Sequence, residues 1–204
     1  MLVGVGLGPG SPDLLTLRAI EVLKNSKKIY VPGKLAYELV KPYRDALILD
    51  FPMIRDRIEL ERIWGENARI VGEAARTGVV SFALIGDPNF FSTFTHLKRK
   101  VKELYPEIVI DTVPGVSSIT AFASRAGVEV DSSFEVSDGS DTRSKIIMKV
   151  KKPREVVGSL KKDGYTEFML FENLFMDDEA IYQNDLPDKA GYLSILYAKR
   201  GREP

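Results

Sequence analysis

Residues 85–94 read Ile-Gly-Asp-Pro-Asn-Phe-Phe-Ser-Thr-Phe, and they end an apolar run at 79–85 that is typical of a buried strand. Gly86 lets another group approach the backbone closely, while Pro88 removes a hydrogen-bond donor and holds Asp87 in an extended conformation. In open parallel sheets, ligands bind at the carboxyl ends of the strands. The stretch therefore predicts either a binding turn or a tight strand-to-helix turn in which Asp87 is only a cap.

The composition is that of a globular protein with a substantial core. The 204 residues are 44% hydrophobic and 28% charged, and 29 Lys and Arg balance 29 Asp and Glu. This balance gives no global attraction to nucleic acid, and no apolar run reaches the roughly 18 residues of a membrane span. The absence of cysteine excludes disulfides and thiolate nucleophiles and favours a cytoplasmic protein. No His, Asp and Glu cluster has the spacing of a metal site.

Strands and helices alternate through the first half of the chain, which predicts a mostly parallel sheet with right-handed crossovers. Ser11 and Pro12 suit the N-cap and first position of a helix that follows the first strand. Trp64 is expected in the core. The remaining elements are strands expected at 2–5, 28–31, 46–49, 79–85 and 108–110, and helices at 55–76 and 95–104.

The turn Val-Pro-Gly-Val-Ser-Ser at 113–118 opens a second half that is smaller and richer in strands. We predict an α/β protein of two α/β domains, an N-terminal domain at 1–112 and a C-terminal domain at 113–204. Ser117 or Ser118 would cap a helix that Gly127 ends. The other elements expected are strands at 146–150, 168–171 and 192–197, the last as an antiparallel edge, and a helix at 153–160.

The glycine-rich loop at 6–10 also invites a dinucleotide-binding interpretation. The full pattern G-x-G-x-x-G requires a further glycine at position 9 or 11, where Pro9 and Ser11 stand. A nicotinamide or flavin enzyme is therefore disfavoured.

Three motifs in register carry a more specific signal. They are the loop at 6–17, Gly-Asp-Pro at 86–88 and the turn at 113–118, and together they resemble the signatures of the tetrapyrrole (corrin/porphyrin) methylases. The resemblance spans nearly the whole chain. It implies two α/β domains with S-adenosylmethionine bound in the cleft between them, usually in a homodimer.

Within that family, residues 49–53, 86–94, 147–150 and 181–195 resemble the members that methylate C20 of precorrin-2 or cobalt-precorrin-2. The implied activity is methyl transfer from S-adenosylmethionine to a tetrapyrrole during corrin-ring synthesis, with S-adenosylhomocysteine as product and any cobalt carried by the substrate. The alternatives are a methylase of the same fold that acts at another ring position or, like diphthine synthases, on a protein side chain, and a non-catalytic relative that only binds the cofactor.

The resemblance implies cofactor contacts but assigns no catalytic residue. His96 is either a proton-transfer group or a packing histidine, and a basic group near the start of the second half either faces substrate carboxylates or forms a solvated surface. Two departures concern the substrate: Phe91 stands where relatives carry tyrosine, and the stretch from Gly127 to Ile146 is short. The basic group is Lys145, Lys149, Lys151, Lys152 and Arg154. The implied cofactor contacts are Pro9, Ile85, Gly86, Asp87, Phe90, Ser117, Ser118, Met148 and Leu174.

Overall fold

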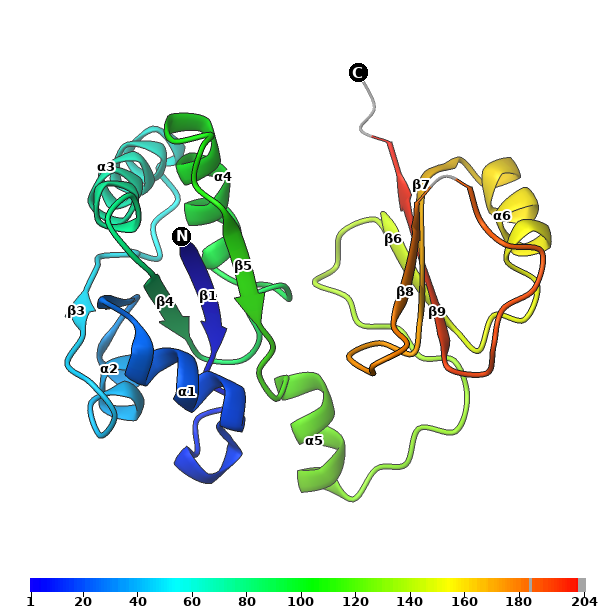
Figure 1. Cartoon of the computed structure of the whole chain (residues 1–204), viewed down its shortest axis with the longest axis horizontal. Coiled ribbons are helices and arrows are strands. Elements are labelled where there is room, and N and C mark those ends of the chain that lie inside the picture. The colour runs from blue at the N-terminus through cyan, green and yellow to red at the C-terminus, as the bar shows by residue number, and fades with distance from the viewer. Residues whose placement is uncertain (184, 202–204) are drawn as a thin grey trace. The chain divides into compact units, whose positions relative to one another are not determined.

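The structure is a computed structural model that describes residues 1–183 and 185–201 (Figure 1). Its contacts divide the chain into two compact units, Met1–Phe134 and Glu135–Pro204. Each unit has its own sheet and its own apolar core, and each is described by itself below.

Residues 113–134 lie in the first unit, although the sequence predicted a domain boundary after residue 112. Two contacts explain the difference. Strand β5 (Ile110–Val113) pairs in parallel with β1 (Leu2–Gly6), and the N–H of Gly115 donates to the carboxylate of Asp87. The turn at 113–118 is therefore held to the first sheet instead of opening a new one.

The strands of the first unit form one parallel sheet in the order β3-β2-β4-β1-β5. β1 and β4 are buried along their whole length, as expected of a parallel sheet that is covered on both faces. This confirms the predicted mostly parallel sheet. Its strands are β1 (Leu2–Gly6), β2 (Lys28–Val31), β3 (Leu47–Ile48), β4 (Val80–Leu84) and β5 (Ile110–Val113).

Helices cover both faces of this sheet (Figure 1). Leu2 and Val3 are adjacent on β1 and therefore point to opposite faces, so each belongs to a different core. Leu2 lies in the core with Phe94 of α4, and Val3 lies in the core with Leu23 of α1. The helices are α1 (Leu17–Asn25), α2 (Lys34–Val40), α3 (Arg57–Ala75), α4 (Phe94–Leu104) and α5 (Ser118–Ala126).

The segment after β1 differs from its prediction. Pro12–Leu14 forms only a short 3-10 turn, and α1 begins at Leu17. The hydroxyl of Thr16 accepts the N–H of Ala19 at 3.1 Å and caps this helix, the role predicted for Ser11. Leu15 explains the interruption, because its extended backbone turns the side chain into the core.

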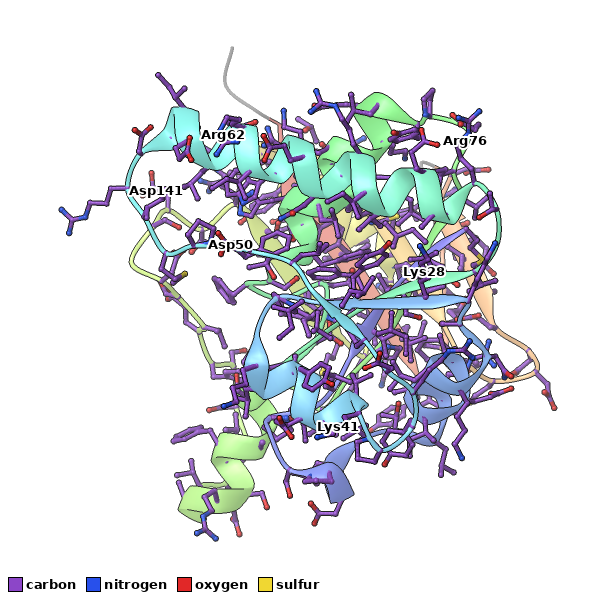
Figure 2. All side chains as sticks on the ribbon, turned by 90° about the vertical axis from the view of Figure 1, so that its left-hand side faces the viewer. Lys28, Lys41, Asp50, Arg62, Arg76 and Asp141 are labelled. Atoms are coloured by element: carbon purple, nitrogen blue, oxygen red, sulfur yellow. The ribbon has the colours of Figure 1, made fainter. Side chains whose placement is uncertain are left out.

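Helix α3 has one apolar face and one charged face. Ala68, Val71 and Ala75 are buried, whereas Arg62 pairs with acidic residues on the exposed side (Figure 2). Trp64 was predicted in the core but is only half-buried, because its indole stacks on the imidazole of His96 from α4 near the surface.

The second unit is an antiparallel sheet in the order β6-β9-β7-β8, with one helix, α6 (Pro153–Lys162). The prediction that the last strand is an edge was wrong, because β9 lies between β6 and β7. Its alternation instead buries Ser194, Leu196 and Ala198 on one face. The strands are β6 (Ser144–Met148), β7 (Tyr165–Glu172), β8 (Ala180–Gln183) and β9 (Ser194–Arg200).

Two short elements, α2 and β8, were not predicted. Both are too brief for hydrophobic periodicity to identify. The strand expected at 108–110 forms instead at Ile110–Val113, because the N–H of Ile108 closes a turn onto the carbonyl of Tyr105. Within residues 1–183 and 185–201, no helix is long and apolar enough to cross a membrane.

Two glycines on α3 test the packing of this helix on α4. A Cβ at Gly72 would overlap the ring of Tyr105, whereas a Cβ at Gly65 would enter open space. We expect Gly72→Ala to lower the free energy of unfolding by about 1–3 kcal/mol, and Gly65→Ala to raise it by up to about 1 kcal/mol through helix propensity. Urea denaturation of both variants measures this difference, and equal effects would contradict the packing described here.

Candidate functional site

Three turns meet at the carboxyl ends of β1, β4 and β5. The N–H of Gly86 donates to the carbonyl of Gly8 at 2.7 Å, and the N–H of Leu7 donates to the carbonyl of Leu84 at 2.8 Å. The turn after β5 reaches the same place through Gly115. The three sequence motifs, far apart in the chain, therefore form one junction of backbone.

Only glycine fits at the centre of this junction. A Cβ at Gly6 would lie 2.5 Å from the nitrogen of Gly115 and 2.7 Å from the carbonyl oxygen of Gly86. A Cβ at Gly115 would lie 2.8 Å from the Cα of Gly6. These neighbours are backbone atoms and cannot rotate away, so the glycines are required by the close approach of the chains.

The carboxylate of Asp87 joins two of the turns. One oxygen accepts the N–H of Asn89 at 2.8 Å, and the other accepts the N–H of Gly115 at 3.1 Å. The residue is only 8% exposed. Asp87 is thus more than a cap for the following helix, because it bonds the turn after β4 to the turn after β5. Any bond to a ligand would be additional to these two.

The outer side of the junction is open. Gly10 and Gly86 adopt positive φ angles of 129° and 80°, and a Cβ on either would meet nothing within 4 Å. Phe90 is half-exposed beside them, and Phe91 is exposed with a positive φ of 47°. The turns next to Ile85 therefore form a cradle that faces open space at Gly10 and Gly86, where no side chain stands.

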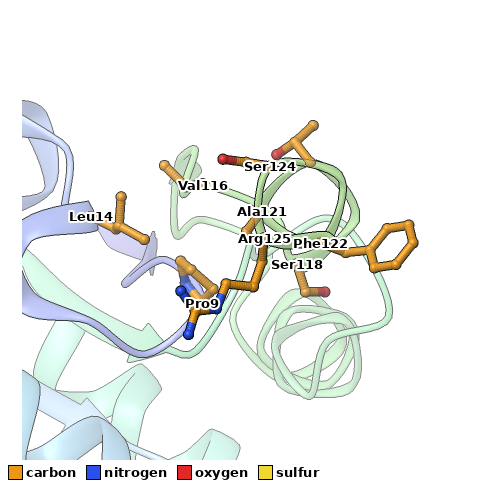
Figure 3. A pocket seen from close by; sticks show the side chains of 9 residues that line it. Pro9, Leu14, Val116, Ser118, Ala121, Phe122, Ser124 and Arg125 are labelled. Carbon is orange, nitrogen blue, oxygen red and sulfur yellow. The ribbon is translucent and has the colours of Figure 1, made fainter. Parts of the chain in front are cut away.

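A cavity of about 760 Å³ adjoins the first turn, and it brings Pro9 and Ser118 together (Figure 3). Its lining is mostly apolar and hydroxyl-bearing, with Arg125 as its charged side chain. The hydroxyl of Ser117 is directed elsewhere, since it accepts the N–H of Ile119 at 3.3 Å and caps α5. The other lining residues are Leu14, Val116, Thr120, Ala121, Phe122 and Ser124.

Met148 and Leu174 belong to the second unit and lie at one end of its sheet. Met148 ends β6, Leu174 follows β7, and the start of β9 lies between those two strands. Both side chains are accessible, at 66% and 40% exposed. Three non-glycine residues in this region have positive φ angles, which concentrates backbone strain there: Lys149, Asn173 and Phe175. Sequence patterns gave no sign of it.

His96, the single histidine of the chain, packs instead on Trp64. The two rings are parallel within 13°, with centroids 3.9 Å apart. Burial lowers the pKa of the imidazole below its ordinary value, the nearby Arg99 lowers it further, and Glu61 acts in the opposite direction. In residues 1–183 and 185–201, no three His, Asp or Glu side chains are grouped to hold a metal ion.

The sequence profile of the tetrapyrrole (corrin/porphyrin) methylases matches residues 1–190. The chain belongs to this family. The three turns of the junction are the segments on which the resemblance was founded, so this methylase brings its family signatures together in space.

Curated relatives are consistent with this membership. A probable cobalt-precorrin-2 C(20)-methyltransferase of Methanocaldococcus jannaschii is 34% identical over 97% of this chain and 95% of its own length. The cobalt-precorrin-2 C(20)-methyltransferase of Salmonella typhimurium is 34% identical over 61% of this chain and 56% of its own. The first alignment runs to 224 positions against the 204 residues here, so that relative contains segments that this methylase lacks.

Solved structures support the fold. A putative cobalamin synthesis related protein from Corynebacterium diphtheriae, CobF, superimposes with a TM-score of 0.52 at 18% identity, covering 98% of each chain. At this identity the likeness establishes the α/β fold of the methylase family.

Substitution of Asp87 tests the junction. In Asp87→Asn the amide nitrogen would face a backbone N–H, which leaves one donor unsatisfied, so we expect the free energy of unfolding to fall by about 1–3 kcal/mol. Asp111→Asn is the matched control, because Asp111 is exposed and bonds only its neighbour Thr112. Urea denaturation compares the two variants, and an Asp87→Asn variant as stable as the wild type would show that the two hydrogen bonds of Asp87 are dispensable.

The histidine can be followed directly because it is the only one. NMR titration should place the pKa of His96 below its ordinary value of about 6.5, higher in Arg99→Gln and lower still in Glu61→Gln. Because the pKa of His96 is lower in the folded protein than in the unfolded chain, the unfolded chain takes up the proton at a higher pH. The contribution of His96 to the free energy of unfolding is therefore fully present above the ordinary pKa of about 6.5 and is lost as the pH falls below it. A pKa above 6.5 would show that the indole face and Glu61 outweigh burial.

Proposed function

We propose that this methylase transfers a methyl group from S-adenosylmethionine to C20 of precorrin-2 or cobalt-precorrin-2 in corrin-ring synthesis. The observation that carries the proposal is the identity of 34% with a probable C(20)-methyltransferase over 97% of the chain. The junction of the three turns gives that similarity a physical basis, because the matching motifs form one accessible backbone cradle.

The cradle would hold part of the S-adenosylmethionine molecule. Open space beside Gly10 and Gly86 would let a ligand approach these turns without interference from a side chain. Pro9, Ile85, Gly86, Asp87 and Phe90 would contact it from the first two turns, and Ser117 and Ser118 from the third. Met148 and Leu174, which are accessible at one end of the sheet of the second unit, are the other proposed contacts. The cofactor supplies an electrophilic methyl group on a sulfonium.

The role of the protein is then to position the methyl donor and the ring carbon, and no reactive side chain is required. Effective-molarity arguments allow roughly 7–11 kcal/mol of barrier lowering from alignment of the reacting groups. The rigid backbone contacts of Gly6, Gly86 and Gly115 suit this task because they cannot change rotamer. His96 is stacked on Trp64, which favours a packing role for it.

We also propose that the protein is a cytoplasmic homodimer. Its lack of cysteine agrees with a reducing compartment. The exposed apolar side chains on both units supply surface that a second copy could cover, among them Leu35, Ile58, Phe134 and Ile181. Light scattering of the purified protein determines its assembly state, and a monomer at all concentrations would refute this part of the proposal.

The activity is tested with S-adenosylmethionine carrying a ¹³C-methyl group. Incubation with precorrin-2, and separately with its cobalt complex, should give one new methyl signal at C20 by NMR, and the preferred substrate shows whether cobalt is present at this step. Gly86→Val would fill the cradle and should abolish binding of S-adenosylhomocysteine, measured by calorimetry on protein that still unfolds cooperatively in urea, because a φ of 80° strains valine as well. Gly65→Ala, outside the cradle, should bind as the wild type does. A methyl group at another carbon, or no turnover with either ring, would refute the C20 assignment.

A further inference from the structure

Lys149 holds an unfavourable backbone conformation at a defined place. It follows β6 directly and has a φ of 57°, which glycine would adopt without strain. Its N–H donates to the carbonyl of Ser194 at 2.8 Å, so the start of β9 helps to hold the turn. A strained lysine where glycine would fit indicates that the side chain itself is needed.

The structure separates Lys149 from two of its basic neighbours by their ion pairs and from Lys145 by its place, since Lys145 lies over the ring of Tyr165 instead. The ammonium of Lys152 pairs with Glu155 at 2.8 Å, and the guanidinium of Arg154 pairs with Asp188 at 2.9 Å. In the described part of the chain, no carboxylate oxygen lies within 4.0 Å of the Lys149 ammonium. Its Nζ instead lies 5.1 Å from the ring centroid of Tyr192, which favours a cation over the aromatic face.

The surroundings of this ammonium are accessible and include several apolar side chains, and the turn after β7 also carries the exposed acidic residues Asp177, Asp178 and Glu179. Met148, the neighbouring residue, is 66% exposed, and Tyr192 is 63% exposed. The turn that follows β7, at the same end of the sheet, adds further exposed side chains, Leu174, Phe175 and Met176. One unpaired cation beside an apolar surface matches a flat apolar molecule that carries carboxylates at its edge.

The geometry points to Lys149 as a substrate-binding residue that pairs with a side-chain carboxylate of the tetrapyrrole. This inference rests on the proposed function for the class of substrate. An amine-to-carboxylate contact at a partly exposed position also explains why lysine stays unpaired here: an acidic neighbour within the chain would compete with the ligand.

Four variants separate the charge from the strain. Lys149→Met removes the charge and keeps the strain, whereas Lys149→Gly removes both, and Lys149→Arg keeps the charge. Lys151→Met is the matched control, since Lys151 is also exposed and its loss changes the net charge equally. Binding of precorrin-2 is measured by absorbance titration in the presence of S-adenosylhomocysteine, so that no transfer occurs.

We expect both Lys149→Met and Lys149→Gly to weaken precorrin-2 binding about tenfold, with S-adenosylhomocysteine affinity unchanged. Lys149→Gly should unfold at or above the wild-type temperature, which excludes a damaged fold as the cause. Lys149→Arg and Lys151→Met should bind as wild type does. Added salt should weaken precorrin-2 binding by the wild type more than by Lys149→Met, because salt screens the charge contact that only the wild type makes.

The outcomes distinguish this inference from the proposed function. Wild-type affinity in Lys149→Met and Lys149→Gly, or equal weakening in Lys151→Met, overturns the role of Lys149. If the wild type binds precorrin-2 but yields no C20 methyl, the proposed activity fails while the variants still decide the carboxylate contact by affinity. If the wild type does not bind precorrin-2 or its cobalt complex, both are refuted.

Discussion

The close approach of backbone at three turns is the constraint on which the candidate site depends. Backbone atoms of Gly6, Gly86 and Gly115 approach one another so closely that a Cβ added at Gly6 or at Gly115 would force the chains apart. Asp87 completes the junction by accepting an N–H on each carboxylate oxygen. Such a junction is rigid because its bonds run between main-chain atoms of neighbouring parallel strands, which are themselves buried on both faces of the sheet.

This rigidity suits a reaction that needs alignment more than acid–base chemistry. A methylase that draws its barrier lowering from position gains little from mobile catalytic side chains and much from fixed backbone. The unusual residues of the first unit agree with that division. Gly10 and Gly86 face open space, while the histidine is stacked on a tryptophan, where burial and Arg99 lower its pKa.

The second unit differs in where its backbone is strained. Its strain lies in non-glycine residues at one end of an antiparallel sheet, where Lys149, Asn173 and Phe175 all have positive φ angles. The first unit has glycine where close approach requires it and a strained Phe91 beside that junction, whereas three strained non-glycine residues gather at one end of the second sheet.

Much of the organisation could be derived from the order of residues. Alternating apolar runs and helical periodicity predicted the parallel sheet, and three motifs in register indicated the family, because these signals are local and repeat along the chain. Only tertiary structure decided four features: the central position of β9, the attachment of residues 113–134 to the first unit, the Trp64–His96 stack and the two hydrogen bonds that the Asp87 carboxylate accepts. Each depends on which distant segments meet, and a pattern along one strand or helix holds no information about the partner on its other side.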